Sequence, residues 1–159
     1  MSNIIWEFTG ETKIYFGVTL RRIRAAVEFK LKCGIVIAKG ELGGWIEKES
    51  NLSGDAWVSG NAKVSGNSWV YHDAKVYGNA EVYGYADVKS SKDYCVYKNT
   101  WSSFRWFTYT RSNKMWKVGC FYGTGAELIT KAYKDSEKSG KCYEAIVKAQ
   151  EAIEKAMEV

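Results

Sequence analysis

The sequence predicts a mainly β protein built around a short parallel β-helix, and three observations lead to that prediction. Between Ile46 and Asp87 the chain repeats every six residues. The first position of each unit is a branched aliphatic residue, and the fifth is always Ala or Ser. Four of the seven units carry Gly-Asn or Gly-Asp between these positions. A hexapeptide period is typical of a solenoid in which successive rungs bury one another.

The repeat can be explained position by position. Side chains alternate between the faces of a strand, so positions one and five can both point inward. Position one supplies bulk, whereas position five must be small where the chain turns a corner. Gly, Asn and Asp tolerate the positive φ that a sharp corner demands. The inward positions are Ile46, Leu52, Val58, Val64, Val70, Val76 and Val82, with Ser50, Ala56, Ala62, Ser68, Ala74, Ala80 and Ala86.

This pattern resembles the left-handed parallel β-helix of hexapeptide-repeat proteins, in which three hexads make one triangular coil. The resemblance implies about two coils and a stacking offset of eighteen residues. Trp57 would then lie over Lys75 as a cation–π pair, and Lys63 over Glu81 as an exposed ion pair. So short a stack leaves both ends open, so we expect the flanking segments to cap it and copies of the chain to form a homo-oligomer.

The N-terminal region, residues 1–45, is expected to supply strands and one cap. The segments IIWEF and KIYFGVTL are strand-like in alternation and β-branched content. The following LRRIRAAVEF suits a short helix with Thr19 as N-cap, or else a bent strand leading into the coil. Its Arg21, Arg22 and Arg24 could hold an anion or form a solvated face. The repeat itself occupies residues 46–93.

The C-terminal region, residues 94–159, reads as an α+β module of a hairpin and two helices. SFRWFTYT and KMWKVGC predict two strands joined by residues 111–114. Thr124 and Glu127 form a capping box, which predicts a helix from there to about Lys138. Ser139 would cap a second helix that runs to the end of the chain, with apolar residues at helical spacing.

Composition narrows the function classes. The 159 residues carry a net charge of +5 and 15% aromatic residues, which suits an acidic partner. No apolar run approaches membrane-spanning length and no signal-peptide pattern opens the chain, so a cytoplasmic protein is expected. The four cysteines are far apart and form no CxxC pair, so neither a metal site nor a cofactor is expected.

Candidate binding residues fall into two groups. The hairpin interleaves bases with aromatics, a mixture that can stack a nucleobase and neutralise phosphate or can simply pack on the helices. The amides around Gly123 and Thr124 open a helix and could bind an anion. The ligand-binding candidates are Arg22, Arg24, Arg105, Trp106, Arg111, Lys117, Gly123 and Thr124. The candidates for contact with other protein chains are Tyr71, Tyr77, Tyr83, Trp57 and Trp69.

Two residues were weighed for catalysis. His72 is the only histidine and could serve as a general base, as in some hexapeptide-repeat transferases, but it stands where other hexads have a corner glycine. Cys120 precedes a capped helix start, which can lower a thiol pKa, yet we expect it to be buried on the hairpin. The chain has no paired-carboxylate motif, metal-ligand spacing, phosphate loop or dinucleotide fingerprint, so no catalytic residue is assigned.

The order of segments resembles a set of small phage and prophage proteins. The shared features are the RIRA entry at residues 22–25, the GELGGWIEKESNL lead-in, the hexads, and a terminal module with Trp106, Tyr109, Cys120 and Glu127. The resemblance implies a phage protein acting in the cytoplasm of an infected bacterial host. We expect a non-enzymatic counter-defence protein that sequesters an anionic nucleotide signal. The alternatives are an anti-CRISPR-type inhibitor that contacts a host defence protein, a hexapeptide-repeat transferase and a structural component of the virion.

Overall fold

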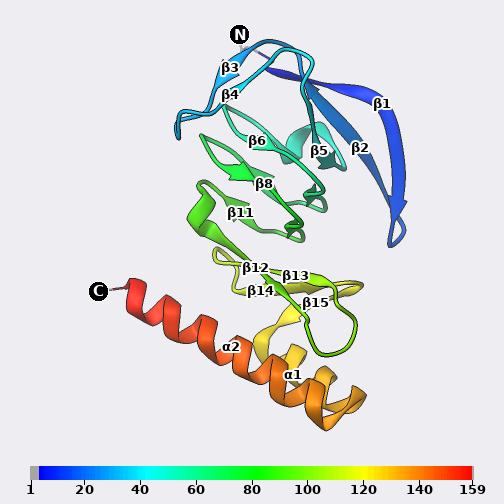
Figure 1. Cartoon of the computed structure of the whole chain (residues 1–159), viewed down its shortest axis with the longest axis vertical. Helices are drawn as coiled ribbons and strands as arrows, with labels where there is room; N and C mark the ends of the chain where they lie inside the picture. Colours follow the sequence, from blue (N-terminus) through cyan, green and yellow to red (C-terminus); the bar gives the residue numbers. More distant parts are fainter. Residues whose placement is uncertain (1–3, 159) are drawn as a thin grey trace.

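In the computed structural model, which describes residues 4–158, the chain is arranged as three parts along one long axis (Figure 1). N-terminal strands lie at one end. The two-residue strands of the repeat, which we call the rungs, lie in the middle, and a sheet with two helices lies at the other end. The prediction of a mainly β chain with two C-terminal helices is confirmed. Residues 1–3 of the predicted N-terminal region and the final residue of the predicted second helix lie outside the described residues.

The hexads form two-residue strands that pair in parallel. The pairs are β6 with β9, β7 with β10, and β8 with β11, each at an offset of eighteen residues. Trp57 therefore lies opposite Lys75, as the sequence predicted. The first-position valines and fifth-position alanines are fully buried or nearly so and form the larger core. The strands are β6 (Trp57–Val58), β7 (Lys63–Val64), β8 (Trp69–Val70), β9 (Lys75–Val76), β10 (Glu81–Val82) and β11 (Asp87–Val88).

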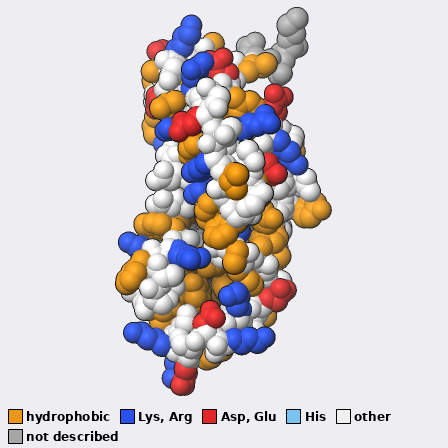
Figure 2. Space-filling view, turned by 90° about the vertical axis from the view of Figure 1, so that its right-hand side faces the viewer, with side chains coloured by type: hydrophobic (Ala, Val, Ile, Leu, Met, Phe, Trp, Pro, Cys, Tyr) orange, Lys and Arg blue, Asp and Glu red, His pale blue; other side chains and the backbone are white. Residues whose placement is uncertain are grey.

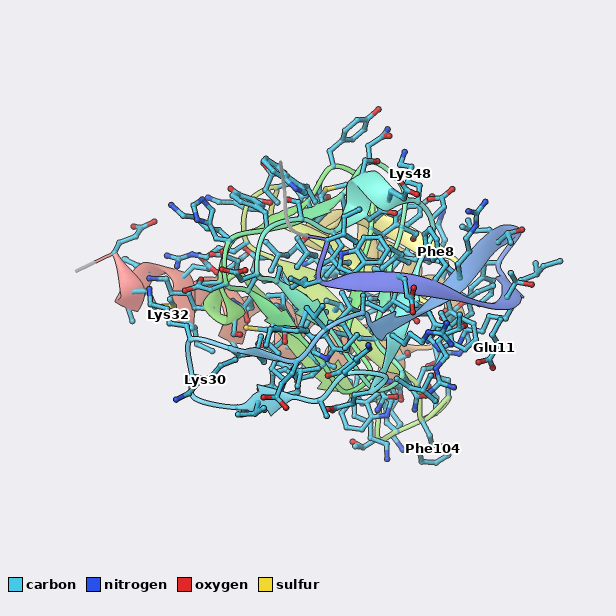
Figure 3. The ribbon with its side chains drawn as sticks, turned by 90° about the horizontal axis from the view of Figure 1, so that it is seen from above. Phe8, Glu11, Lys30, Lys32, Lys48 and Phe104 are labelled. Atoms are coloured by element: carbon cyan, nitrogen blue, oxygen red, sulfur yellow. The ribbon has the colours of Figure 1, made fainter. Side chains whose placement is uncertain are left out.

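The N-terminal strands extend this core upward as a mixed sheet of order β1-β2-β5-β7-β10. β1 (Trp6–Tyr15) and β2 (Val18–Ala25) form an antiparallel hairpin, and β5 (Leu42–Ile46) joins β2 to the first rung. The short strands β3 (Phe29–Lys30) and β4 (Val36–Ile37) pair beside them. Seen from above, β1 passes over the end of the rungs, with Lys30 and Lys32 on one side and Glu11 at the other (Figure 3).

The helix predicted for residues 20–29 is wrong, and the alternative of a bent strand agrees with the structure. β2 hydrogen-bonds to β1 on one side and to β5 on the other, with a register shift on each. Leu20, Ile23 and Ala25 are buried against the rungs. The register shift between Arg22 and Arg24 breaks the usual two-residue alternation, so Leu20 and Ile23 are both buried although they are three residues apart. Pairing on both sides of β2 therefore overrides the local helical pattern.

The C-terminal module is a four-stranded antiparallel sheet covered by two helices. β13 (Trp106–Thr110) and β14 (Met115–Val118) form the predicted hairpin. β12 (Tyr94–Lys98) and β15 (Phe121–Thr124) flank it, and these two strands were not predicted. Phe107, Trp116 and Leu128 belong to a second core between the sheet and the helices.

The helix boundaries differ in part from the prediction. Helix α1 (Gly125–Asp135) begins as predicted, with the Thr124 hydroxyl accepting from the Glu127 amide at 3.2 Å. It ends sooner than expected, because α2 (Glu137–Met157) starts at once. The N-cap of α2 is Ser136, whose hydroxyl accepts from the Ser139 amide at 3.0 Å, so the prediction of Ser139 as the cap is wrong.

Side chains of the C-terminal module close the lower end of the rungs. The 3₁₀ turn η2 (Ser91–Asp93) links the last rung to this module, whereas the turn η1 (Glu49–Asn51) precedes β6 at the other end. The backbone amide of Glu81 donates to the Thr108 hydroxyl, and that of Asp87 to the Ser112 hydroxyl, both at 2.8 Å. The Tyr94 hydroxyl donates to the Lys75 carbonyl at 2.9 Å. The last rungs thus find hydrogen-bond partners in the flanking module, as expected of a cap.

Candidate functional site

The tip of the β1–β2 hairpin hangs beside the rungs, above the C-terminal sheet (Figure 1). Side chains from these three parts line a cleft. It consists of two adjoining hollows of about 140 and 290 Å³ that share Tyr15, Phe16, Lys63 and Glu81. We call this space the hairpin cleft. One hollow is also lined by Tyr83, Lys117, Cys120 and Tyr122, and the other by Asn79, Arg105, Trp106 and Gly119.

Three cationic side chains line the hairpin cleft. Lys63 is mostly buried, and its Nζ lies 3.9 Å from Glu81 Oε1. Lys117 is 8% exposed, and its Nζ donates to the Gly119 carbonyl. Arg105 is exposed and forms no ion pair with any residue in 4–158. The Arg105 guanidinium and the two lysine ammonium groups, set against one carboxylate among the described lining residues, give the cleft an excess of positive charge.

Glu81 is the only acidic residue that lines the cleft among the described residues. Its side chain is nearly buried, with the residue 7% exposed. The Tyr15 hydroxyl donates to Oε1, whereas Oε2 is buried and has no hydrogen-bond partner within residues 4–158. A carboxylate oxygen left without a donor is costly, so Glu81 is the feature of this site that internal packing explains least.

Burial shifts the titration of the groups around this carboxylate. Burial lowers the pKa of Lys117, and the Glu81 charge opposes that shift. Burial also lowers the pKa of Lys13 beside the cleft, and the nearby Lys63 and Arg22 charges lower it further. Burial and the hydrogen bond to Glu81 raise the pKa of Tyr15, so its phenol remains a proton donor at neutral pH.

Aromatic rings supply much of the rest of the wall. Phe16 is 53% exposed at the hairpin tip and has a left-handed backbone with φ of 46°, and Trp106 is 41% exposed across the cleft. Lys63 Nζ lies 4.7 Å from the Tyr15 ring centroid, and Lys117 Nζ lies 4.9 Å from that of Tyr83. On the face that carries the hairpin, hydrophobic side chains form a band across mid-height, with Lys and Arg side chains beside it (Figure 2). Such a wall can stack a planar ring and neutralise an anion at once.

The structure brings only some of the predicted ligand-binding residues together. Arg105, Trp106 and Lys117 all line the hairpin cleft. The arginines at positions 22, 24 and 111 lie elsewhere and are paired with carboxylates, to Glu11 at 3.3 Å, Glu7 at 2.8 Å and Glu154 at 2.9 Å respectively. Each of these three arginines already has an anionic partner within the chain and lies outside the hairpin cleft, so their role as anion ligands stays a prediction that this cleft does not support.

The helix start at Gly123 and Thr124 is also occupied by the protein's own groups. The Thr124 hydroxyl caps α1, and it lies 3.2 Å from Glu127 Oε1. A methyl group at Gly123 would meet Glu127 Oε2 at 2.8 Å, so this carboxylate lies directly beside the glycine. The Glu127 carboxylate beside this helix start disfavours a second anion there, so the anion site at these amides stays a prediction without support from the geometry.

The predicted contact residues have different environments. Trp57 is completely buried, with Phe29 edge-on at a centroid distance of 5.4 Å, so its assignment to an interface is wrong. The cation–π pair expected between Trp57 and Lys75 is not formed either, because Lys75 Nζ lies over the Tyr77 ring at 5.2 Å.

The other contact candidates are more accessible. Trp69 is 43% exposed and stacks on Tyr71 with centroids 3.9 Å apart, and Tyr77 is 54% exposed. Tyr83 instead faces into the hairpin cleft, where its ring meets Tyr122 edge-on at 5.0 Å. Of the predicted contact residues, Trp69 and Tyr77 are therefore the exposed ones, and Tyr71 is half-buried beneath its stack with Trp69.

The two candidate catalytic residues, His72 and Cys120, lie in different surroundings. His72 sits at a rung corner with φ of 56°, its backbone beneath that of Gly54, which agrees with the interpretation as a corner residue. Cys120 is exposed in the turn between β14 and β15, so the expectation that it is buried is wrong. Within residues 4–158 no three potential metal ligands of the Cys, His, Asp and Glu types come together.

The four residues that both hollows share were not predicted from the sequence to bind a ligand: Tyr15, Phe16, Lys63 and Glu81. The eighteen-residue offset did predict the Lys63–Glu81 pair, but as an exposed ion pair worth little. The structure covers it with the hairpin tip, leaving side-chain exposures of 16% and 9%. The available signal was the Phe16-Gly17 turn, which presents an aromatic residue at the end of a long hairpin.

No protein-family model, curated protein or solved structure matches this chain. None of the helices described is long and apolar enough to cross a membrane.

Proposed function

We propose that this protein is a non-enzymatic binding protein that takes up a small anionic nucleotide-type ligand in the hairpin cleft. One observation carries the proposal: Lys63, Lys117 and Arg105 converge with exposed aromatic rings on one cleft whose lining includes a single carboxylate. Nucleotides combine a planar ring with a phosphate, and this wall offers a partner to each.

The exposure of the side chains in the cleft indicates which of them would contact the phosphate and which the base. Arg105 stands at the rim with its guanidinium unpaired, so it can meet a phosphate in a bidentate manner at little cost in desolvation. Phe16 and Trp106, from the hairpin tip and from β13, present partly exposed rings to the same hollow. Stacking on such rings contributes about 1–3 kcal/mol per base, comparable to the contribution of a charged hydrogen bond.

The phage-like order of segments in the sequence favours a counter-defence role in the cytoplasm of an infected bacterium, where sequestration of a nucleotide signal needs tight binding and no turnover. We also propose a homo-oligomer, since the Trp69–Tyr71 stack and Tyr77 remain exposed on the rungs. Light scattering coupled to size exclusion tests this, and a monomeric mass at tens of micromolar would reject it.

We further propose that the rungs are a stub of a left-handed parallel β-helix. Parallel pairs at an offset of eighteen residues support three hexads per coil. The corner glycines with φ between 63° and 69° support the sharp turns that such a coil needs. An experimental structure in which the rungs coil the other way would reject the assigned handedness.

Calorimetric titration with a panel of linear and cyclic nucleotides tests the ligand class. We expect at least one nucleotide to bind and Arg105→Ala to weaken it about tenfold or more. Arg24→Ala is the matched control, because Arg24 is also exposed but is paired with Glu7 on the outer hairpin. Silence of the wild-type protein across the panel, or equal losses in both variants, would reject the proposal.

Inhibition by protein contact is a second candidate, favoured by the exposed Trp69–Tyr71 stack. A stacked, partly exposed Trp–Tyr pair is the kind of group that dominates protein interfaces. A pull-down from host lysate would capture a defence protein with the wild type and lose it with Trp69→Ala, whereas Arg105→Ala would retain it. Capture that depends on Arg105 and not on Trp69 would reject this candidate.

A further inference from the structure

We infer that Glu81 is the residue that selects the base, and that the ligand is a guanine nucleotide. The inference rests on the proposed function and deepens it by naming the base. It starts from a mismatch within the hairpin cleft, where Glu81 Oε2 has no hydrogen-bond partner among residues 4–158 although the residue is only 7% exposed.

Internal packing leaves part of the Glu81 carboxylate unused. A carboxylate offers about four lone-pair positions. Tyr15 donates to Oε1, and Lys63 Nζ approaches the same oxygen at 3.9 Å. Both contacts fall on one oxygen, so Oε2 keeps its full acceptor capacity in a site where the loss of water is not compensated.

The chemistry of the missing donor can be specified. The edge of guanine that pairs in duplexes carries two adjacent N–H donors, which a carboxylate can accept together. The same edge of adenine or cytosine sets a ring-nitrogen acceptor beside its amino group, and that acceptor would face the Glu81 charge. A site built to accept hydrogen bonds discriminates strongly against a ligand that lacks the donors, because its buried polar group then stays unpaired.

The remaining wall suits the rest of such a ligand. With the base edge at Glu81, its ring would lie against Phe16, which is exposed at the hairpin tip and shares both hollows with Glu81. Arg105 lies in the same hollow as Glu81 and is free to meet the phosphate. Because Oε2 is itself screened from water, entry of the base requires the Glu81 carboxyl group or the adjacent Tyr15–Phe16 turn to shift.

Calorimetry of the full-length protein with GMP, IMP, AMP and CMP tests the inference. We expect GMP to bind most tightly, about tenfold or more above AMP and CMP, with IMP between them because it lacks the exocyclic amino donor. Glu81→Gln should weaken GMP about tenfold and reduce its advantage over AMP. Asp87→Asn is the matched control, since Asp87 is exposed at the same position of the next hexad and lies outside the cleft lining.

The possible results distinguish guanine selection by Glu81 from nucleotide binding in general. Equal binding of all four nucleotides, or tighter binding of AMP or CMP than of GMP, overturns the role of Glu81 while leaving nucleotide binding in place. Absence of binding by any nucleotide in the wild-type protein overturns both. The order of affinities is measured on the wild type, so the inference stays falsifiable even if Glu81→Gln fails to fold.

Discussion

Replacing Gly84 and Gly78 by alanine in turn gives a matched test of how the C-terminal module seats on the rungs. The two glycines occupy the same position in adjacent hexads and have φ of 69° and 67°. A methyl group at Gly84 would clash with the Tyr122 hydroxyl oxygen, whereas a methyl group at Gly78 would meet nothing within 4 Å among the described residues. The backbone strain is therefore shared, and only the contact with Tyr122 differs.

The expected costs follow from these contacts. A left-handed backbone costs an alanine about 1–2 kcal/mol, offset in part by the lower entropy of the unfolded chain, so Gly78→Ala should lose about 1 kcal/mol. Gly84→Ala must also displace the Tyr122 side chain. Its hydroxyl then no longer accepts the hydrogen bond from the Asn113 side-chain amide, and its ring loses the edge contact with Tyr83. Those two losses add about 2 kcal/mol, for a total of about 3 kcal/mol.

Thermal and urea unfolding followed by circular dichroism would measure the difference. For a chain of this size 1 kcal/mol corresponds to about 2–4 °C in Tm, so we expect drops of about 3 °C for Gly78→Ala and about 9 °C for Gly84→Ala. Equal drops would refute the reasoning, because they would mean that Tyr122 does not pack on the corner at Gly84. A larger loss for Gly78→Ala would refute it as well.

Three further predictions concern buried charge, alkaline pH and helix capping. Lys117→Met should weaken nucleotide binding several-fold and leave the free energy of unfolding at pH 7 unchanged or higher. Burial lowers the pKa of Lys117, so its charged form opposes folding at every pH below that pKa. A variant strongly destabilised in urea would contradict this prediction. Burial raises the pKa of Tyr94 and of Tyr109 to about 12, so the unfolded chain loses these protons near pH 10 and the folded chain does not. The urea midpoint should therefore fall steadily between pH 10 and pH 12, and a constant midpoint would count against the burial of these phenols. Thr124→Ala should cost about 1 kcal/mol in urea unfolding, since it removes the cap of α1, and Thr124→Ser should restore most of it; no recovery with Ser would argue against capping as the cause.

The repeat was the most predictable part of the fold because its signal is local and periodic. Each hexad places an aliphatic and a tiny residue inward. Once the resemblance to hexapeptide-repeat proteins supplied three hexads per coil, the pairing of Trp57 with Lys75 followed from the period. The same holds for the start of α1, where Thr124 and Glu127 form a capping box within four residues. Such features depend on neighbours in sequence and not on distant parts of the chain.

The errors occurred where distant segments decide the outcome. Residues 20–29 have helical spacing, yet β1 and β5 offer hydrogen bonds on both sides and hold them as a strand. Ser136 and Ser139 are equally good caps by type, and only the early end of α1 selects Ser136. Local propensity contributes too little free energy to compete with such tertiary pairing.

The candidate site was predicted only in half for the same reason. Arg105, Trp106 and Lys117 were recognised because bases and aromatics alternate within one hairpin. Their partners Tyr15 and Glu81 lie 66 residues apart and meet only when the N-terminal hairpin folds down over the rungs. Nothing in either segment alone reveals that the Glu81 carboxylate becomes buried.

The central claim is that the hairpin cleft binds a nucleotide, and a crystal structure of the wild-type protein grown with GMP tests it most directly. We expect density for the base beside Glu81 and Phe16 and for the phosphate at Arg105. A fully occupied nucleotide bound elsewhere on the chain, or an empty cleft at saturating GMP and at saturating AMP, would contradict the claim.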